Sequence, residues 1–277
     1  MRALEHQVPA RALALLLLLL APSLAAAAPS PKRGYVANTG SQLIDATLLA
    51  PGTSWYYAYE MASPYCPGAA CDAVAQQFLP QPWCLDDAQA PLPPYVNRSG
   101  VLLGFNEPNF PTQCNKSPGE VAAAWGALAA RWPPPGALAS PAVALNGSAT
   151  SWWLDQFFAQ CSALYGAGGC AGIAYVAVHD YTCDAQATMA YLAAVHARYQ
   201  LPVVLSEFAC GSVKHKRPVA EEAALMRALV PLLEAAPHVA RYAWMSARDP
   251  DGLRNLVEAG AGGAAQLSEL GQLYVSL

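Results

Sequence analysis

The chain has 277 residues, of which 55% are hydrophobic and only 12% are charged, and its formal net charge is −4. This composition suits a large buried core with few surface ions, and the negative balance argues against nucleic acid as a partner. The one basic cluster, at 214–217, is expected to be a solvated loop.

The first 28 residues have the pattern of a secretory signal peptide. Arg2 and Arg11 lie in a polar start, residues 12–20 are apolar, and three alanines at 26–28 offer small residues for cleavage. The apolar run is short for a bilayer span, and Pro22 follows it closely. A retained single-span anchor is the alternative. We expect a secreted protein without stable membrane insertion, with one domain over residues 32–277.

The cysteine content agrees with an oxidising compartment, because the number is even and none of the residues forms a Cys-x-x-Cys pair of the kind that binds zinc. We expect disulfides, two of them being Cys161–Cys170 across a glycine-rich loop and Cys183–Cys210 between loops that follow neighbouring strands. The remaining connectivity stays open. The eight cysteines are Cys66, Cys71, Cys84, Cys114, Cys161, Cys170, Cys183 and Cys210.

Three sequons for N-glycosylation begin at Asn97, Asn115 and Asn146. They are compatible with glycosylated surface loops in a secreted glycoprotein. Pro118 closely follows the Asn115 sequon, so that asparagine has a structural role as its alternative.

Apolar strand patterns alternate with helical patterns along the rest of the chain. This alternation favours an α/β fold of the parallel (β/α)8, or TIM barrel, type over a doubly wound sheet, and about 250 residues is the usual size of such a barrel. The count of eight strands also depends on the resemblance given below. Helices are expected over 121–130, with Ser117 as the N-cap, and over 185–199 and 220–235. Strands are expected at Arg33–Ala37, Ser54–Tyr59, Phe78–Trp83, Val101–Phe105, Ala137–Ser140, Ile173–Val178, Val203–Ser206 and Tyr242–Met245.

Polar residues follow the fourth expected strand at once. Asn106 and Glu107 come directly after Phe105, and Pro108 forces the chain to turn there. Side chains at the carboxyl ends of barrel strands face the substrate, so an amide and a carboxylate at this position are candidates for sugar binding and acid/base chemistry. A turn with a capping asparagine is the alternative.

The seventh expected strand repeats this arrangement, because Glu207 follows the apolar residues Val203, Val204 and Leu205. Two carboxyl groups at two strand ends are what double-displacement glycoside hydrolysis requires. One acts as nucleophile and the other as acid and then base, at a separation of roughly 5–5.5 Å. The second glutamate therefore favours the catalytic interpretation of Glu107.

Aromatic residues and a histidine lie at two further strand ends. His179 and Tyr181 are two positions apart at the end of the sixth strand, so both side chains point the same way. We favour a role beside Glu207 for them, with a satisfied core histidine as the alternative. Trp244, at the end of the eighth strand, is interpreted as the ring under the sugar, with a core tryptophan as the alternative. Core or helix-packing positions are expected for Trp55, Trp125, Trp132 and Trp152.

An ordered series of motifs from about residue 33 to the end resembles glycoside hydrolase family 128, the alkali-sensitive-linkage type of glycosyl hydrolase catalytic domain. The motifs are Leu-Gly-Phe-Asn-Glu-Pro at 103–108, Gln-Cys-Asn-Lys-Ser-Pro at 113–118, Ser-Pro-Ala-Val at 140–143, Trp-Leu-Asp-Gln-Phe-Phe at 153–158, Val-Ala-Val-His-Asp-Tyr at 176–181, Ser-Glu-Phe-Ala at 206–209 and Arg-Tyr-Ala-Trp at 241–244.

This resemblance implies a retaining endo-β-1,3-glucanase of clan A that needs no metal or other cofactor. By carry-over, Glu107 is the acid/base, Glu207 is the nucleophile, and Asn106 binds the sugar 2-hydroxyl. Tyr57 and Trp83, near the ends of the second and third strands, are expected to bind substrate. The two carboxyl groups should lie in different environments, because the acid must hold its proton while the nucleophile stays ionised.

Three positions depart from the family pattern and bear on subsite affinity. The second strand ends in Ala58-Tyr59 where the family usually has Asn-Trp, Gln81 stands where it tends to carry Met, and Asp180 stands where it often has Trp.

Two other classes of function remain as alternatives. One is a catalytically idle protein that binds glucan or cell wall through the same barrel, although a pure binder needs no pair of carboxylates. The other is a metalloenzyme that uses His179, His196, His215 and Asp180, but no pair of these residues has a recognised ligand spacing. We therefore expect a monomeric hydrolase acting on a β-glucan polysaccharide.

Overall fold

The computed structural model describes residues 28–38, 40–66, 76–98, 100–144, 148–211, 215 and 217–277, with no side-chain description for 148–151. The expected signal peptide lies outside these residues except for Ala28, and so does the Asn146 sequon.

The larger sheet follows the order β3-β2-β1-β9-β8-β7-β5-β4, with β6 paired to β7, and all of these pairings are parallel. Its strands are β1 (Arg33–Val36), β2 (Trp55–Tyr57), β3 (Gln77–Phe78), β4 (Val101–Leu102), β5 (Ala137–Ala139), β6 (Val143–Ala144), β7 (Ile173–Asp180), β8 (Val203–Phe208) and β9 (Val239–Trp244).

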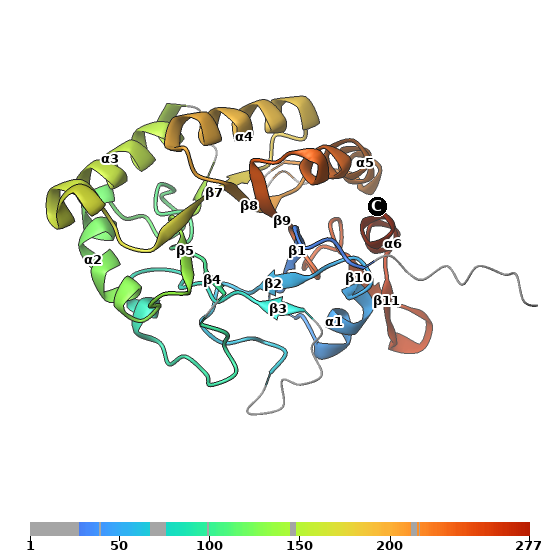
Figure 1. Ribbon diagram of the computed structural model, residues 1–277. Helices are drawn as coiled ribbons and strands as arrows, with labels where there is room; N and C mark the ends of the chain where they lie inside the picture. The colour runs from blue at the N-terminus through green and yellow to red at the C-terminus, as the bar shows by residue number, and fades with distance from the viewer. Residues whose placement is uncertain are drawn as a thin grey trace, which may run out of the picture.

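Helices lie around the outside of this sheet (Figure 1). They are α1 (Leu43–Leu49), α2 (Pro118–Ala130), α3 (Ser148–Tyr165), α4 (Ala185–Tyr199), α5 (Val219–Ala235) and α6 (Glu269–Ser276), with short 3-10 turns at Asp86–Gln89, Gly166–Gly168 and Ala261–Gly263. The expected capping at Ser117 is confirmed, since its hydroxyl accepts from the Glu120 N–H and the Glu120 side chain accepts from the Ser117 N–H. Within the described residues, none of the helices is long and apolar enough to span a bilayer.

The barrel closes between β3 and β4 through single hydrogen bonds. The Leu103 N–H donates to the Pro80 carbonyl and the Asn106 N–H to the Trp83 carbonyl, each at 3.0 Å. Pro80 and Pro82 have no N–H to return, so no continuous ladder forms there. This is why the expected strand at 78–83 overlaps β3 only at Phe78.

All eight expected strand ranges overlap observed strands, and the α/β barrel is confirmed. The structure adds β6 and a separate antiparallel hairpin of β10 (Val257–Ala259) and β11 (Ala265–Leu267), which the sequence analysis did not predict. Each of these three strands has only two or three residues, which is too short for a recognisable period-2 pattern.

Two apolar clusters form the core. The larger packs between the strands and the helices, and the smaller fills the barrel with residues such as Val36, Tyr57, Leu79, Val204 and Ala243. Of the four tryptophans expected in packing positions, Trp55, Trp125 and Trp132 are buried, but Trp152 is 58% exposed, so that prediction is wrong. Its neighbour Trp153 is the one that packs inward from α3, and the Trp153 indole donates to the Lys116 carbonyl at 3.1 Å.

Candidate active site

Glu107 lies just beyond β4 in a turn that its neighbours hold firmly. Its N–H donates to the Ala142 carbonyl at 2.8 Å, and Asn106 forms a parallel bridge with Ala142. The φ of Glu107 is 40°, a left-handed conformation that few non-glycine residues adopt and that persists where the surrounding structure imposes it. Gly104 permits the close approach of this segment, because a Cβ there would lie 2.5 Å from the Ser140 carbonyl. The backbone thus aims the Glu107 carboxyl toward β7.

Glu207 lies on β8, and four groups surround its carboxylate. Tyr57 and Tyr59 donate to Oε1 at 3.1 and 2.6 Å, and Tyr181 donates a short hydrogen bond to Oε2. His179 Nδ1 lies 3.3 Å from the same Oε2. A carboxyl group that accepts at both oxygens from three hydroxyls is arranged as an ionised carboxylate, which has acceptors only.

His179 lies between the two glutamates and is completely buried. Its Nδ1 is 2.8 Å from Glu107 Oε1, in addition to its contact with Glu207. Burial lowers the pKa of the imidazole, but the charge of Glu207 and then the hydrogen bond and charge of Glu107 outweigh burial, so the pKa lies above its ordinary value. The ring therefore links the two carboxyl groups through Nδ1.

The three phenols at Glu207 remain protonated over the working range of an enzyme. Burial, followed by the negative charge of Glu207, raises the pKa of Tyr57, Tyr59 and Tyr181 well above the ordinary tyrosine value. Each hydroxyl is therefore available as a hydrogen-bond donor to the carboxylate.

Ligand atoms of Glu107, His179 and Glu207 all lie within 4.8 Å of one another. Among the described residues, this is the one group of histidine, cysteine or acidic side chains whose geometry could hold a metal ion. It differs from the set considered for the alternative of a metalloenzyme, because His196 Nδ1 contacts the Leu201 carbonyl and Asp180 accepts from Thr182 and Thr188. The same spacing fits the carboxyl pair of a retaining glycosidase, for which roughly 5–5.5 Å is typical.

Two expected sugar-binding residues border this cluster. The Trp83 ring is partly exposed and lies edge-on to Tyr59, with ring centroids 5.3 Å apart. Asn106 is buried, its Nδ2 lies 3.5 Å from Gln113 Oε1, and its Oδ1 has no partner within the described structure. Trp83 thus offers a partly exposed ring next to a phenol that contacts Glu207, and Asn106 has a buried amide oxygen without a partner directly before Glu107.

Trp244 is not at the site, so its interpretation as the ring under the sugar is wrong. The side chain is fully buried, its indole donates to the Arg254 carbonyl at 2.9 Å, and it packs edge-on against Phe208 at 5.1 Å. Successive strand residues point to opposite faces, and Trp244 points to the helix side. The next residue, Met245, points to the site instead, because its Sδ lies 3.4 Å from the Tyr59 hydroxyl.

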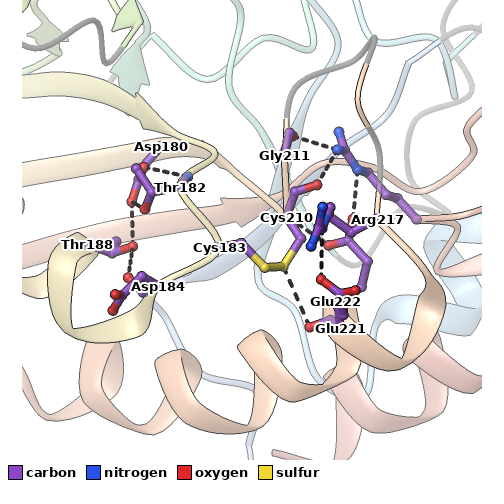
Figure 2. The surroundings of a disulfide bond; sticks show 11 residues. Asp180, Thr182, Cys183, Asp184, Thr188, Cys210, Gly211, Arg217, Glu221 and Glu222 are labelled. Carbon is purple, nitrogen blue, oxygen red and sulfur yellow. Dashed lines mark hydrogen bonds and ion pairs between the residues drawn. A yellow bond between two sulfur atoms is a disulfide. The ribbon is translucent and has the colours of Figure 1, made fainter.

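The expected disulfide Cys183–Cys210 is present and joins the loops after β7 and β8 (Figure 2). Beside it, the buried Glu222 of α5 accepts from the Cys210 N–H at 2.7 Å and from Arg254 Nε at 2.9 Å. The Arg254 guanidinium also lies over the Tyr181 ring, 5.5 Å from its centroid. This network connects the Glu222 carboxylate to a ring that holds Glu207.

Asp180 serves the same loop and does not reach the carboxyl pair. Figure 2 shows it turned toward Thr182 and Thr188, and it accepts from the Thr182 N–H at 2.9 Å and from the hydroxyls of both threonines. This departure from the family pattern therefore supports the start of α4.

The other disulfides lie at different places in the barrel. Cys161–Cys170 is present as expected, and Cys84–Cys114, which was not predicted, ties the segment after β3 to the loop that follows Glu107. These bonds agree with an oxidising compartment.

Sequence analysis did not assign Tyr59, Met245, Arg254 or Glu222 to the site or its support, although it named Tyr59 as a departure that bears on subsite affinity. The position of Tyr59, two residues after Tyr57, could have identified it, since residues at this spacing share one face of a strand. The other three carried no local signal, because their partners come from distant segments.

A closed barrel of parallel strands with two buried carboxyl groups at strand ends defines the class of barrel glycoside hydrolases. The family model described as glycosyl hydrolase catalytic core matches residues 35–274, so the chain belongs to that family. A search of curated proteins found no match.

Solved structures confirm the resemblance to glycoside hydrolase family 128. A GH128 subgroup II endo-β-1,3-glucanase from Sorangium cellulosum is 29% identical, with a TM-score of 0.69, over 88% of this chain and 98% of that one. A subgroup II enzyme from Pseudomonas viridiflava is 26% identical, with a TM-score of 0.70, over 90% and 98%. A subgroup I enzyme from Amycolatopsis mediterranei, crystallised with laminaritriose, shares the fold at 24% identity and a TM-score of 0.71, over 89% and 99%.

Proposed function

We propose that the protein is a secreted, monomeric, retaining endo-β-1,3-glucanase that works by double displacement. The observation that carries this proposal is the cluster of Glu107, His179 and Glu207, whose ligand atoms lie within 4.8 Å of one another. The β-1,3-glucan substrate is supported by similar enzymes, one of which was crystallised with laminaritriose. The expected signal peptide at residues 1–28 and the disulfides support secretion.

The two glutamates take different roles because their partners differ. Glu207, held by three phenols, attacks the anomeric carbon and forms a C–O bond to it. As the glycosidic C–O bond breaks, Glu107 gives its proton to the leaving oxygen. In the second step water attacks the same carbon, Glu107 takes a proton from that water, and Glu207 leaves as a carboxylate.

Two side chains are assigned to substrate binding from their positions. Asn106, with a free amide oxygen beside Glu107, is assigned to the sugar 2-hydroxyl. Trp83, partly exposed and next to Tyr59, offers a ring on which a sugar C–H face can stack.

The test is the configuration of the first product from linear β-1,3-glucan, followed by proton NMR. The proposal expects the β anomer at the new reducing end, with a mixture of oligosaccharides from internal cleavage. A first-released α product would show inversion and contradict the mechanism. Glucose as the sole product would contradict the endo mode.

A second measurement distinguishes the proposed enzyme from a non-catalytic protein that binds glucan through the same barrel. Purified protein that retains glucan in a pull-down but releases no dye from cross-linked β-1,3-glucan would be a binder. Cross-linked β-1,4-glucan serves as the matched control for linkage.

A further inference from the structure

We infer that Tyr59 is a positioning residue for the nucleophile, one that orients Glu207 through its hydrogen bond to Oε1. This inference rests on the proposed retaining mechanism.

The Tyr59 hydroxyl makes the closer of the two contacts to Glu207 Oε1. Its oxygen lies 2.6 Å away, whereas the Tyr57 hydroxyl lies at 3.1 Å and also donates to the Ser206 carbonyl at 3.1 Å. Tyr57 is therefore shared between two oxygen acceptors, whereas the second acceptor of Tyr59 is the weakly accepting thioether of Met245 at 3.4 Å. The orientation of Oε1 depends mainly on Tyr59.

The backbone and the neighbouring rings hold Tyr59 in this position. Its φ is 55°, in the left-handed region that a bulky residue seldom adopts and that is typical of functional sites. The ring is edge-on to Tyr57 at 5.2 Å and to Trp83 at 5.3 Å, and Met245 Sδ lies against the hydroxyl. A strained residue clamped from three sides keeps its hydroxyl aimed at one oxygen.

When Glu207 leaves in the second step, negative charge returns to its carboxylate, and the Tyr59 hydroxyl stabilises that charge through its hydrogen bond to Oε1.

The experiment compares Tyr59→Phe with Tyr56→Phe. The first variant keeps the ring and removes the hydroxyl. The control removes the hydroxyl of the adjacent residue, which contacts Ser63 Oγ at 2.6 Å on the opposite face of β2. The probe is 2-deoxy-2-fluoro-laminaribiosyl fluoride, which traps the covalent glycosyl-enzyme, and the readout is the rate of the mass increase of the intact protein.

The expected result is that Tyr59→Phe is labelled about tenfold to a hundredfold more slowly, with a similar fall in kcat and little change in KM. Tyr56→Phe should be labelled at the wild-type rate. Circular dichroism and the Tm check that both variants are folded, and Tyr59→Leu provides a second variant that lacks the hydroxyl.

Equal labelling of Tyr59→Phe and wild type would overturn the inference. So would an equal loss in Tyr56→Phe, since that would reflect a general effect on β2. If wild type releases β products from glucan but Tyr59→Phe and Tyr56→Phe are labelled at the same rate, only the inference about Tyr59 fails. If wild type is neither labelled nor active, the proposed function fails and the inference fails with it.

Discussion

The two sides of the barrel differ in strand length, and each side carries one of the two glutamates. On the side of Glu207, β7, β8 and β9 have 8, 6 and 6 residues. On the side of Glu107, β2, β3, β4 and β5 have 3, 2, 2 and 3 residues. The nucleophile therefore lies on a longer strand that is paired on both sides, with register shifts beside Glu207, and the acid/base lies on a turn held by single hydrogen bonds.

The supporting contacts differ in the same way. Behind Glu207 are the Cys183–Cys210 disulfide and the buried Glu222–Arg254 pair. Behind Glu107 are the bond to Ala142 and the Cys84–Cys114 disulfide. A group that forms a covalent bond needs closer positional control than a group that passes a proton over hydrogen-bond distance. The longer strands thus lie where the chemistry demands more precision.

The largest expected effect comes from removing the nucleophile. Glu207→Ala should lower kcat on β-1,3-glucan by about four orders of magnitude or more, because no covalent intermediate can form. Added azide should restore part of the turnover by occupying the vacated space and giving an α-glycosyl azide. Azide rescue absent at Glu207 but present at Glu107 would reverse the roles assigned to the two sides.

Removing the acid should have a smaller effect that depends on the leaving group. Glu107→Gln should lower turnover of glucan by about 10²–10⁴-fold. For a dinitrophenyl glycoside, the rate of the first step should fall much less, because its leaving group needs little protonation. The comparison of kcat/KM for the two substrates measures this, and an equal loss on both would contradict the acid role.

The contribution of the buried Glu222–Arg254 pair behind Glu207 can be tested with two variants of helix α5. Glu222→Ala leaves the Arg254 guanidinium buried without its carboxylate and should cost about 3–5 kcal/mol of unfolding free energy. Glu221→Ala is the matched control, since its pair with Arg217 is solvent-exposed and such pairs contribute about 0–1 kcal/mol. Urea unfolding measures both variants. Similar losses of unfolding free energy in the two variants would show that the buried Glu222–Arg254 pair stabilises the Glu207 side of the barrel no more than an exposed pair does.

The smallest expected effect concerns His179, which joins the two sides. Burial lowers its pKa, but Glu207 and Glu107 raise it by more than burial lowers it. The folded pKa therefore lies above the unfolded value of about 6.5. The stability from its protonation is fully present below that value and is lost as the pH rises through the folded pKa. The difference in unfolding free energy between wild type and His179→Gln should therefore be larger at about pH 6 than at about pH 9. A difference independent of pH would contradict the raised pKa of the His179 imidazole.

Much of the fold could be predicted because the signals are local. The helix at 185–199 is observed with the expected bounds as α4, and its N-cap Asp184 accepts from the Gln186 and Ala187 N–H groups. The strands at the ends of which Glu107 and Glu207 lie were also predicted, as apolar runs followed by polar residues. Two disulfides were predicted from the positions of the cysteines relative to loops and strand ends.

The prediction for Trp244 was wrong for a reason that applies to any strand end. A shift of one residue moves a side chain from one face of a sheet to the other, and an apolar pattern that is buried on both faces does not show which face is inside. The structure places Trp244 against Phe208 and Tyr274, and Met245 against Tyr59.

The sequence by itself determined the barrel class, the two glutamates and their order along the chain, because strand patterns and residue types are local properties. Only the tertiary structure decided that three tyrosines hold Glu207, that one histidine bridges both carboxyl groups, and that Arg254 and Glu222 support the site. Tyr57 and Glu207 are 150 positions apart, and Arg254 and Glu222 are 32 apart. Contacts over such separations depend on how the closed sheet brings distant strand ends together, and no local pattern of residues records that geometry.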